Sequence, residues 1–315
     1  MTYSYYNFGI EIETVVRPYA RRPNFTRQDW YKHLAQKLEN RNVPAAPDLS
    51  LRYSAHPEYY SSKWFITKDG SLQGAHEDFV CMEIVSPVLQ TNGKITSVLA
   101  EFWEAMSVGF EVQQEKTCGG HVHVTPTNAQ KRFSMAELKS VAFAAVVFED
   151  AVHSILPFTR RQNRYCVMNS KSGGGGLSQA CEGGISMSLL RTVRQRLNNI
   201  STPEALYSFM QANRYVLWNF KNIVGEGCSN TLEFRGGSQF RNTATTMKWV
   251  AFVIAFIGLA LKEKLVEGTD FTHISPTAPD FDAQMRTWWN KIRQSALRVK
   301  LRRFLPEDWR QMRVG

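Results

Sequence analysis

The sequence predicts an α+β protein, because strand-like and helix-like segments both recur along the chain. Apolar and polar residues alternate over 8–16, which is typical of a half-buried strand. Two further strand-like segments, 64–68 and 79–86, are connected through Asp69-Gly70, a favoured turn dipeptide. A nearly all-apolar segment over 245–264 predicts a buried helix. The chain therefore combines a sheet with packed helices.

The other elements follow the same patterns in chain order. Ser134-Met-Ala-Glu137 is a capping box that opens a long helix, and Thr202-Pro203 starts another with proline at its first position. The stretch 42–62 and the tract Gly173–Gly176 are expected to be loops. The predicted strands are 8–16, 64–68, 79–86, 110–114, 121–125 and 230–236. The predicted helices are 29–41, 95–108, 135–156, one from Thr202, 245–264 and a basic amphipathic helix from 281 to 304.

Composition excludes several classes of protein. The chain has 315 residues, of which 43% are hydrophobic and 21% charged, so general disorder is excluded. Five scattered cysteines without a CxxC pair favour a reducing compartment, and we expect a cytoplasmic protein. The longest apolar run, 249–261, is too short to cross a bilayer, and residues 1–7 lack the apolar core of a secretory signal. We therefore expect no association with a membrane.

The net charge of +10 lies mainly at the C-terminal end. Residues 283–315 contain nine Lys or Arg and two acids. We expect a main domain over 1–275 and a basic helical extension over 276–315 that packs on it. A nucleic-acid-binding protein that uses the tail is an alternative, but no RNA-binding motif or helix-turn-helix is recognisable. No nucleic-acid partner is expected.

Functional side chains recur two residues apart on four predicted strands. Residues i and i+2 of a strand point to the same face, so each pair shares a face. One strand alone would be explained by a wetted sheet face over a core. Four strands that carry carboxylates and imidazoles, with almost no Lys, Ser or Thr at these positions, favour a shared functional face. The residues are Glu11 and Glu13, Glu83 beside Val85, His121 and His123, and Glu233 and Arg235.

This set of side chains indicates phosphoryl chemistry. Carboxylates at close range repel one another and need a cation between them. Glutamate oxygens suit Mg²⁺ or Mn²⁺, and one or two imidazoles are compatible with either ion. Arg235 offers a planar donor fork for a phosphate or a carboxylate. No P-loop is present, so a nucleotide would have to be held in another way.

The motifs that contain these residues resemble the carboxylate–amine ligase superfamily of glutamine synthetase and glutamate–cysteine ligase, and more narrowly the putative amidoligase family. They occur in the family's order over residues 8 to 240. Each motif is short, but four in order form a specific signal. The motifs are Gly9-Ile-Glu11-Ile-Glu13, Asp69-Gly70-Ser71-Leu72 with Glu83-Ile-Val-Ser86-Pro87, Cys118-Gly119-Gly120-His121-Val-His123-Val, and Thr231-Leu-Glu233-Phe-Arg235-Gly-Gly.

The resemblance implies a fold, cofactors and roles. The fold is a curved, mainly antiparallel sheet with the active site on its concave face and helices packed on the other side, as in the catalytic domain of glutamine synthetase. The cofactors are ATP and about two Mg²⁺ or Mn²⁺ ions. Arg235 would bind the transferred phosphoryl group or the substrate carboxylate, and His123 would lie near the nucleotide. The implied metal ligands are Glu11, Glu13, Glu83, His121 and Glu233.

The family also tends to have an Arg with an Asn or Tyr between its last two motifs. Arg164-Tyr165 with Asn169 and Arg214-Tyr215 with Asn219 are both candidates, and the sequence does not decide between them. Three tyrosines of the long loop are interpreted either as a substrate lid or as a loop packed by its own aromatic rings: Tyr53, Tyr59 and Tyr60.

The leading hypothesis is an ATP-dependent ligase that joins a small-molecule or peptide carboxylate to an amine through an acyl phosphate. The alternative enzyme is a metal-dependent hydrolase, in which His121, His123 and a glutamate hold one Zn²⁺ that activates water. ADP formation that requires both an acid and an amine would separate the two. Ring-forming relatives build sites between subunits, so an oligomer is compatible with the resemblance.

Overall fold

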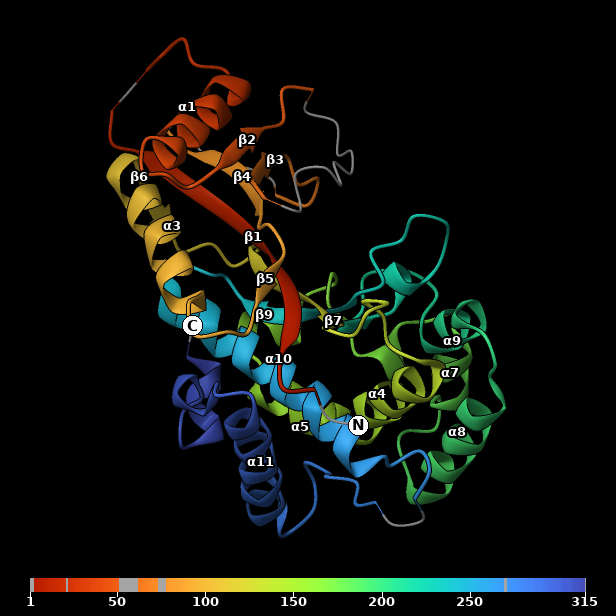
Figure 1. Ribbon diagram of the computed structural model, residues 1–315. Coiled ribbons are helices and arrows are strands. Elements are labelled where there is room, and N and C mark those ends of the chain that lie inside the picture. The colour runs from red at the N-terminus through yellow and green to blue at the C-terminus, as the bar shows by residue number, and fades with distance from the viewer. Residues whose placement is uncertain (1–2, 21, 51–61, 73–77, 269–270, 315) are drawn as a thin grey trace. The chain divides into compact units, whose positions relative to one another are not determined.

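The computed structural model describes residues 3–20, 22–50, 62–72, 78–268 and 271–314 (Figure 1). The chain divides into two compact units. The N-terminal unit comprises residues 7–122 and 237–247, and the C-terminal unit comprises residues 1–6, 123–236 and 248–315. Four elements have residues in both units: β1 (Tyr6–Pro18), β7 (Gly119–Pro126), β9 (Leu232–Ser238) and α10 (Thr243–Glu263).

The N-terminal unit is a sheet with two long helices. Strands β2, β3, β4 and β1 are hydrogen-bonded in that order, and β5 and β6 also pair with β1. The β2–β3 pair is parallel, whereas the pairs of β1 with β4, β5 and β6 and of β3 with β4 are antiparallel. The elements are β1 (Tyr6–Pro18), α1 (Arg27–Glu39), β2 (Ala45–Pro47), β3 (Trp64–Thr67), β4 (Val80–Val85), β5 (Leu89–Gln90), α3 (Ile95–Gly109), β6 (Phe110–Gln113) and the start of β7 (Gly119–Pro126).

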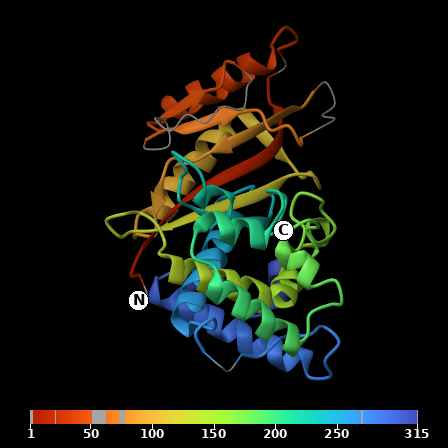
Figure 2. The same ribbon diagram turned by 90° about the vertical axis from the view of Figure 1, so that its right-hand side faces the viewer.

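Helix α1 forms because its start is capped and one face is apolar. Thr26 accepts from the Asp29 N–H, and the Asp29 carboxylate accepts in return from the Thr26 N–H. Helix α1 packs on β2 and β3 (Figure 2), and its buried side chains include Leu34 and Leu38. Helix α1 also contacts β4 (Val80–Val85), the strand that carries Glu83.

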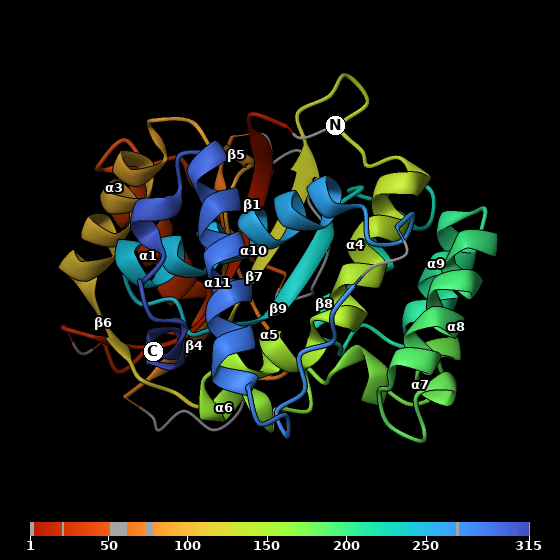
Figure 3. The same ribbon diagram turned by 90° about the horizontal axis from the view of Figure 1, so that it is seen from below.

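The C-terminal unit contains most of the helices and the end of the sheet. Strand β7 neighbours β9, and β9 neighbours β8. Helices α4, α7, α8 and α9 pack together (Figure 3). The elements are α4 (Met135–Val147), α5 (Glu149–Ile155), α6 (Phe158–Arg161), η1 (Asn169–Lys171), α7 (Gly176–Ala180), α8 (Met187–Asn199), α9 (Pro203–Met210), β8 (Trp218–Asn219), η2 (Lys221–Ile223), β9 (Leu232–Ser238), α10 (Thr243–Glu263), α11 (Phe281–Arg298), η3 (Arg302–Phe304) and η4 (Trp309–Arg313).

Helix α10 is the core of the C-terminal unit. By length and composition it could cross a membrane, but 83% of its most apolar window is buried inside the protein, as in a core helix. The Phe252 ring on α10 lies 6.3 Å from that of Trp288 on α11 and 6.2 Å from that of Trp289. The basic extension therefore packs its apolar stripe on the same unit that contains most of α10.

Several predicted elements differ from the observed ones for local reasons. The helix expected over 135–156 is two helices, because Phe148 leaves helical dihedral angles between α4 and α5. The amphipathic helix expected to continue to residue 304 ends at Arg298, where Lys300 adopts a left-handed φ of 59°. Strand β2 lies in the stretch expected to be a loop, and helix α8 was not expected.

The mixed α+β class is confirmed, and the observed strand pairings are mostly antiparallel. The concave curvature and the likeness to glutamine synthetase stay predictions, as do the domain limits at 275 and 276. The three loop tyrosines, at 53, 59 and 60, lie outside the described residues. The structure records no disulfide among the five cysteines, all of which lie in the described residues.

Candidate active site

Three acidic side chains of the N-terminal unit gather on one face of its sheet. Glu11 and Glu13 share a face of β1, and Glu13 lies directly opposite Glu83 of β4 in the antiparallel register. Directly opposed residues of neighbouring strands point to the same side. Glu13 and Glu83 are 4% and 2% exposed, so two carboxylates lie side by side almost out of contact with water.

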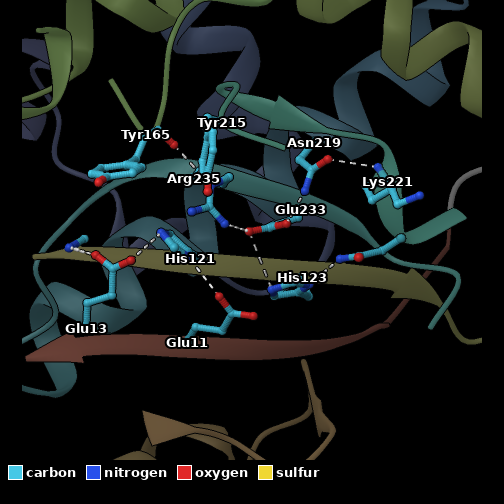
Figure 4. Close-up of polar contacts among 12 residues, drawn as sticks. Glu11, Glu13, His121, His123, Tyr165, Tyr215, Asn219, Lys221, Glu233 and Arg235 are labelled. Atoms are coloured by element: carbon cyan, nitrogen blue, oxygen red, sulfur yellow. Dashed lines mark hydrogen bonds and ion pairs between the residues drawn. The ribbon is translucent and has the colours of Figure 1, made fainter. Parts of the chain in front are cut away.

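His121 on β7 lies between two of these carboxylates (Figure 4). Its Nδ1 is 2.7 Å from Glu11 Oε2, and its Nε2 is 3.3 Å from Glu13 Oε1. The second oxygen of Glu13 accepts from the Gly119 N–H at 2.6 Å. Three of the predicted metal ligands of this unit are therefore in direct contact, and the fourth, Glu83, lies opposite Glu13.

The small residues of the motifs explain this close assembly. The Ile10 N–H donates to Ser86 Oγ at 2.9 Å, which ties the first motif to the second. A Cβ on Gly120 would lie 2.3 Å from the Phe240 ring, and a Cβ on Gly237 would lie 2.4 Å from the Gly120 carbonyl oxygen. Only glycine allows these segments to approach so closely.

A further buried acid of this unit was not found from the sequence. Asp48, which follows β2 and is 3% exposed, accepts from Thr67 Oγ1 at 2.7 Å. Thr67 lies directly opposite Glu83. Burial raises the pKa of the Tyr31 phenol on α1, and the negative charges of Asp48 and Glu83 raise it further. No spacing signal marks Asp48, because it comes from a loop that only the fold places beside β3.

The C-terminal unit holds Glu233 in a dense polar network (Figure 4). The Arg235 guanidinium donates to Glu233 Oε1, and the Asn219 amide donates to Glu233 Oε2 at 2.6 Å. Gln211 in turn donates to Asn219 Oδ1 at 2.6 Å. Glu233 and Arg235 are 3% and 7% exposed. The network fixes one carboxylate and one guanidinium side by side, and Gln211 had no sequence signal.

His123 lies beside the same carboxylate. Its Nε2 is 3.9 Å from Glu233 Oε1, whereas its Nδ1 is 3.3 Å from Thr231 Oγ1 and 3.2 Å from Asn222 Nδ2. Two polar side chains therefore orient the ring from the Nδ1 side, and the Nε2 side faces Glu233.

The two Arg-Tyr dipeptides lie next to each other, so the structure does not select one against the other. Val167 and Val216 form a parallel bridge, and the rings of Tyr165 and Tyr215 are 5.2 Å apart (Figure 4). The exposed Arg164 and Arg214 guanidiniums each lie over the neighbouring tyrosine ring. The Tyr165 carbonyl oxygen accepts from Arg235 Nε at 3.2 Å, which places this segment at Arg235.

The two candidate asparagines have different environments. Asn219 contacts Glu233 directly. Asn169 is fully buried, and its amide donates to the Trp218 carbonyl oxygen at 2.8 Å while its Oδ1 accepts from the Trp218 N–H at 3.0 Å. Asn169 therefore positions the strand that carries Asn219, and only Asn219 contacts the candidate site.

The N-terminal cluster fits a divalent cation. Buried like charges on directly opposed positions destabilise a sheet unless a cation or a proton compensates them. A neutral imidazole donates from one nitrogen only, so His121 can donate a hydrogen bond to only one of its two neighbouring carboxylates. A cation beside His121 could contact both carboxylates. Carboxylate oxygens with one imidazole form a ligand set that suits Mg²⁺ or Mn²⁺.

The chain matches the family described as "Putative amidoligase enzyme" over residues 4–172, more than half of its length. The chain belongs to this family. No curated protein matches it in sequence.

Among solved structures, it is similar to a bifunctional glutathione synthetase from Pasteurella multocida, with 11% identity and a TM-score of 0.34. The similarity covers 95% of this chain and 47% of the synthetase chain, so this chain spans about half the length of that protein. Family membership supports an enzyme that forms amide bonds.

Proposed function

We propose that this protein is an ATP- and Mg²⁺-dependent ligase that joins a carboxylate to an amine through an acyl phosphate. The carboxylate substrate attacks the γ-phosphorus of ATP, which forms the acyl phosphate and releases ADP. The neutral amine then attacks the acyl carbon, phosphate leaves, and the amine loses a proton. The products are an amide, ADP and phosphate.

Each proposed role follows from the chemistry of a side chain. Glu11, Glu13, Glu83 and His121 bind a divalent cation, and Glu233 binds one as well. Such a cation, Mg²⁺ or Mn²⁺, neutralises charge on phosphate oxygens when bound. Arg235 donates its planar fork to the phosphoryl oxygens or the substrate carboxylate, and His123 contacts the nucleotide. The exposed guanidiniums of Arg164 and Arg214 bind carboxylate groups of the substrate.

The observation that carries the proposal is the buried pair Glu13 and Glu83 with His121 and Glu11 against it. A solvated sheet face needs no such pair, and a fold without a ligand gains nothing from burying it. A purely structural core would be more stable with apolar side chains at these positions. This loss of stability supports the proposal that a cation binds to these carboxylates.

The direct test is release of ADP by purified protein with Mg²⁺, ATP and pooled acids and amines. We expect ADP only when both an acid and an amine are present. Mass spectrometry should detect a product lighter than the sum of its precursors by one water. Amide formation without ATP would overturn the proposal, and cleavage of an amide without ATP would favour a hydrolase.

Variants test the site separately from the reaction. Glu11→Gln and Glu233→Gln should lower turnover by about 100-fold or more, since even outer partners of a metal site cost about 10- to 100-fold. Glu104→Gln, on an exposed position of α3, is the matched control and should keep wild-type turnover. Near-normal turnover of either site variant would refute the assignment.

A measurement without substrate tests the cation alone. Mg²⁺ should raise the melting temperature of the wild-type protein, because it binds the folded state. Glu83→Gln should raise the melting temperature without Mg²⁺, since it removes one of two opposed charges, and should abolish the Mg²⁺-dependent increase. An unchanged Mg²⁺ response in this variant would exclude Glu83 as a ligand.

We further propose a cytoplasmic enzyme whose partners are its acid and amine substrates rather than a nucleic acid or a membrane. The buried α10 and the five cysteines, among which no disulfide is recorded, support this location.

A further inference from the structure

The side-chain amide of Asn219 can satisfy its contacts in only one orientation. Asn219 lies directly opposite Glu233 in the antiparallel pairing of β8 with β9. Its Nδ2 donates to Glu233 Oε2 at 2.6 Å, and its Oδ1 accepts from the Lys221 backbone N–H at 2.9 Å (Figure 4). A backbone N–H only donates, so the atom that faces it must be the oxygen. A reversed amide would place an N–H against the Lys221 N–H and an oxygen against the Glu233 carboxylate.

Gln211 holds this orientation from the other side. It follows α9 and is 1% exposed. Its Oε1 accepts from the Phe220 backbone N–H at 2.7 Å, which fixes the orientation of this amide as well. Its Nε2 then donates to Asn219 Oδ1 at 2.6 Å and to the Asn213 carbonyl oxygen at 2.9 Å. Two successive backbone N–H groups therefore decide which way both amides point.

The result at Glu233 is one N–H donor on each carboxylate oxygen. Asn219 donates to Oε2, and the Arg235 guanidinium donates to Oε1. Donors on both oxygens fix the rotation of the carboxylate plane. A carboxylate has about four acceptor positions, so these two donors are compatible with a cation on the same group. A reversed Asn219 amide would place its oxygen against Oε2, and the repulsion would turn the carboxylate away.

Closure of a loop does not account for all the contacts of Gln211. Its bonds to Asn213 and Phe220 join the two ends of the segment 213–220, as a structural side chain would. The bond to Asn219 Oδ1 is different, because that oxygen already accepts from a backbone N–H. With two donors on Oδ1, the Asn219 amide would lose two buried hydrogen bonds if it turned over. The third contact of Gln211 therefore acts on the direction of the Asn219 donor.

We propose that Gln211 is a positioning residue for the cation that Glu233 binds. The inference rests on the proposed function, in which Glu233 is a cation ligand. Gln211 acts through Asn219, whose N–H it keeps turned toward Glu233, and not by contact with the cation. Partners behind a metal ligand contribute about 10- to 100-fold to metal affinity, because they fix the direction of the ligand atoms.

Binding of Mn²⁺ to the full chain tests the proposal without substrate, and the electron paramagnetic resonance signal of free Mn²⁺ measures it. Gln211→Met keeps nearly the same length without the amide. It should weaken by about tenfold the binding step that Glu233→Gln also weakens. Gln195→Met, at an exposed position of α8, is the matched control and should bind Mn²⁺ like wild type.

A double variant separates positioning from a general effect on the fold. Asn219→Leu lacks the amide that Gln211 orients, so Gln211→Met should cause no further loss of Mn²⁺ affinity in this background. A structural role would instead weaken binding by the same factor in both backgrounds. Gln211→Asn serves if Gln211→Met does not fold. Its amide is one methylene shorter and cannot span the Phe220 N–H and Asn219 Oδ1, so it should weaken Mn²⁺ binding to a similar extent.

The outcomes separate this inference from the proposed function. Wild-type affinity in Gln211→Met, or an equal further loss in the Asn219→Leu background, would overturn the inference and leave Glu233 as a ligand. Two other outcomes would overturn the cation role of Glu233 and the inference with it. They are wild-type affinity in Glu233→Gln and the absence of binding by the wild-type protein at millimolar Mn²⁺.

Discussion

Glu149 makes the stability of the C-terminal unit depend on pH. It is the first residue of α5 and is 1% exposed, and its Oε1 accepts from the Ser170 N–H at 3.1 Å. Burial raises the pKa of this carboxyl group from 4.5 to about 7. A pKa that is higher in the folded than in the unfolded protein means that folding favours the protonated form. The contribution of Glu149 to the free energy of unfolding is fully present below about pH 4.5 and is lost as the pH rises to about 7.

The magnitude follows from the two pKa values. At about 1.4 kcal/mol for each pKa unit, ionisation of Glu149 in the unfolded chain lowers the free energy of unfolding by about 3 kcal/mol above pH 7. Glu149→Gln keeps the acceptor for Ser170 and has no titrating proton. The free energy of unfolding of this variant, relative to wild type, should therefore rise by about 2.5 kcal/mol between about pH 5 and about pH 8.

Urea unfolding at several pH values measures this difference. Glu226→Gln, in an exposed loop, is the control, and its difference from wild type should not change with pH. Turnover of Glu149→Gln should be retained, because the neutral side chain keeps the contact beside Asn169, which positions the strand of Asn219. A pH-independent difference for Glu149→Gln would show that the folded protein tolerates the ionised carboxylate and would refute the reasoning.

Three further predictions concern the site and the core. Asn219→Leu removes the amide donor to Glu233, and we expect steady-state turnover to fall by about 10- to 100-fold; unchanged turnover would contradict this role. Gly120→Ala places a Cβ 2.3 Å from the Phe240 ring, so thermal unfolding should show that the free energy of unfolding falls by about 1–3 kcal/mol. An unchanged melting curve would contradict the close approach. Cys228, the one cysteine of the five that is not buried, should react first with a thiol reagent in the native protein, as peptide mapping would show.

The sequence predicted which of the candidate site's side chains share a strand face. Alternation along β1 and β7 placed Glu11 with Glu13 and His121 with His123, because a strand's two faces follow from its period alone. The four motifs predicted the amidoligase family, which the comparison confirmed. Capping signals at Ser134 and Thr202 located the starts of α4 and α9 correctly.

Contacts between distant segments had no local signal. Glu13 opposes Glu83 because β1 and β4 pair in one register, and a shift of one residue would have separated them. Asp48, Gln211 and Glu149 come from a loop or a helix end, where no periodicity reveals a side chain's direction. The two Arg-Tyr dipeptides were alternatives in sequence, yet the bridge between Val167 and Val216 brings them together.

The amino-acid sequence by itself determined which chemical groups the protein can use and on which face of each strand they lie, since those properties depend on residue type and backbone period. Only the tertiary structure decided which carboxylates are neighbours and which amide holds Glu233. Strand register and helix packing set these contacts, and both arise from burial of apolar surface contributed by segments far apart in the chain.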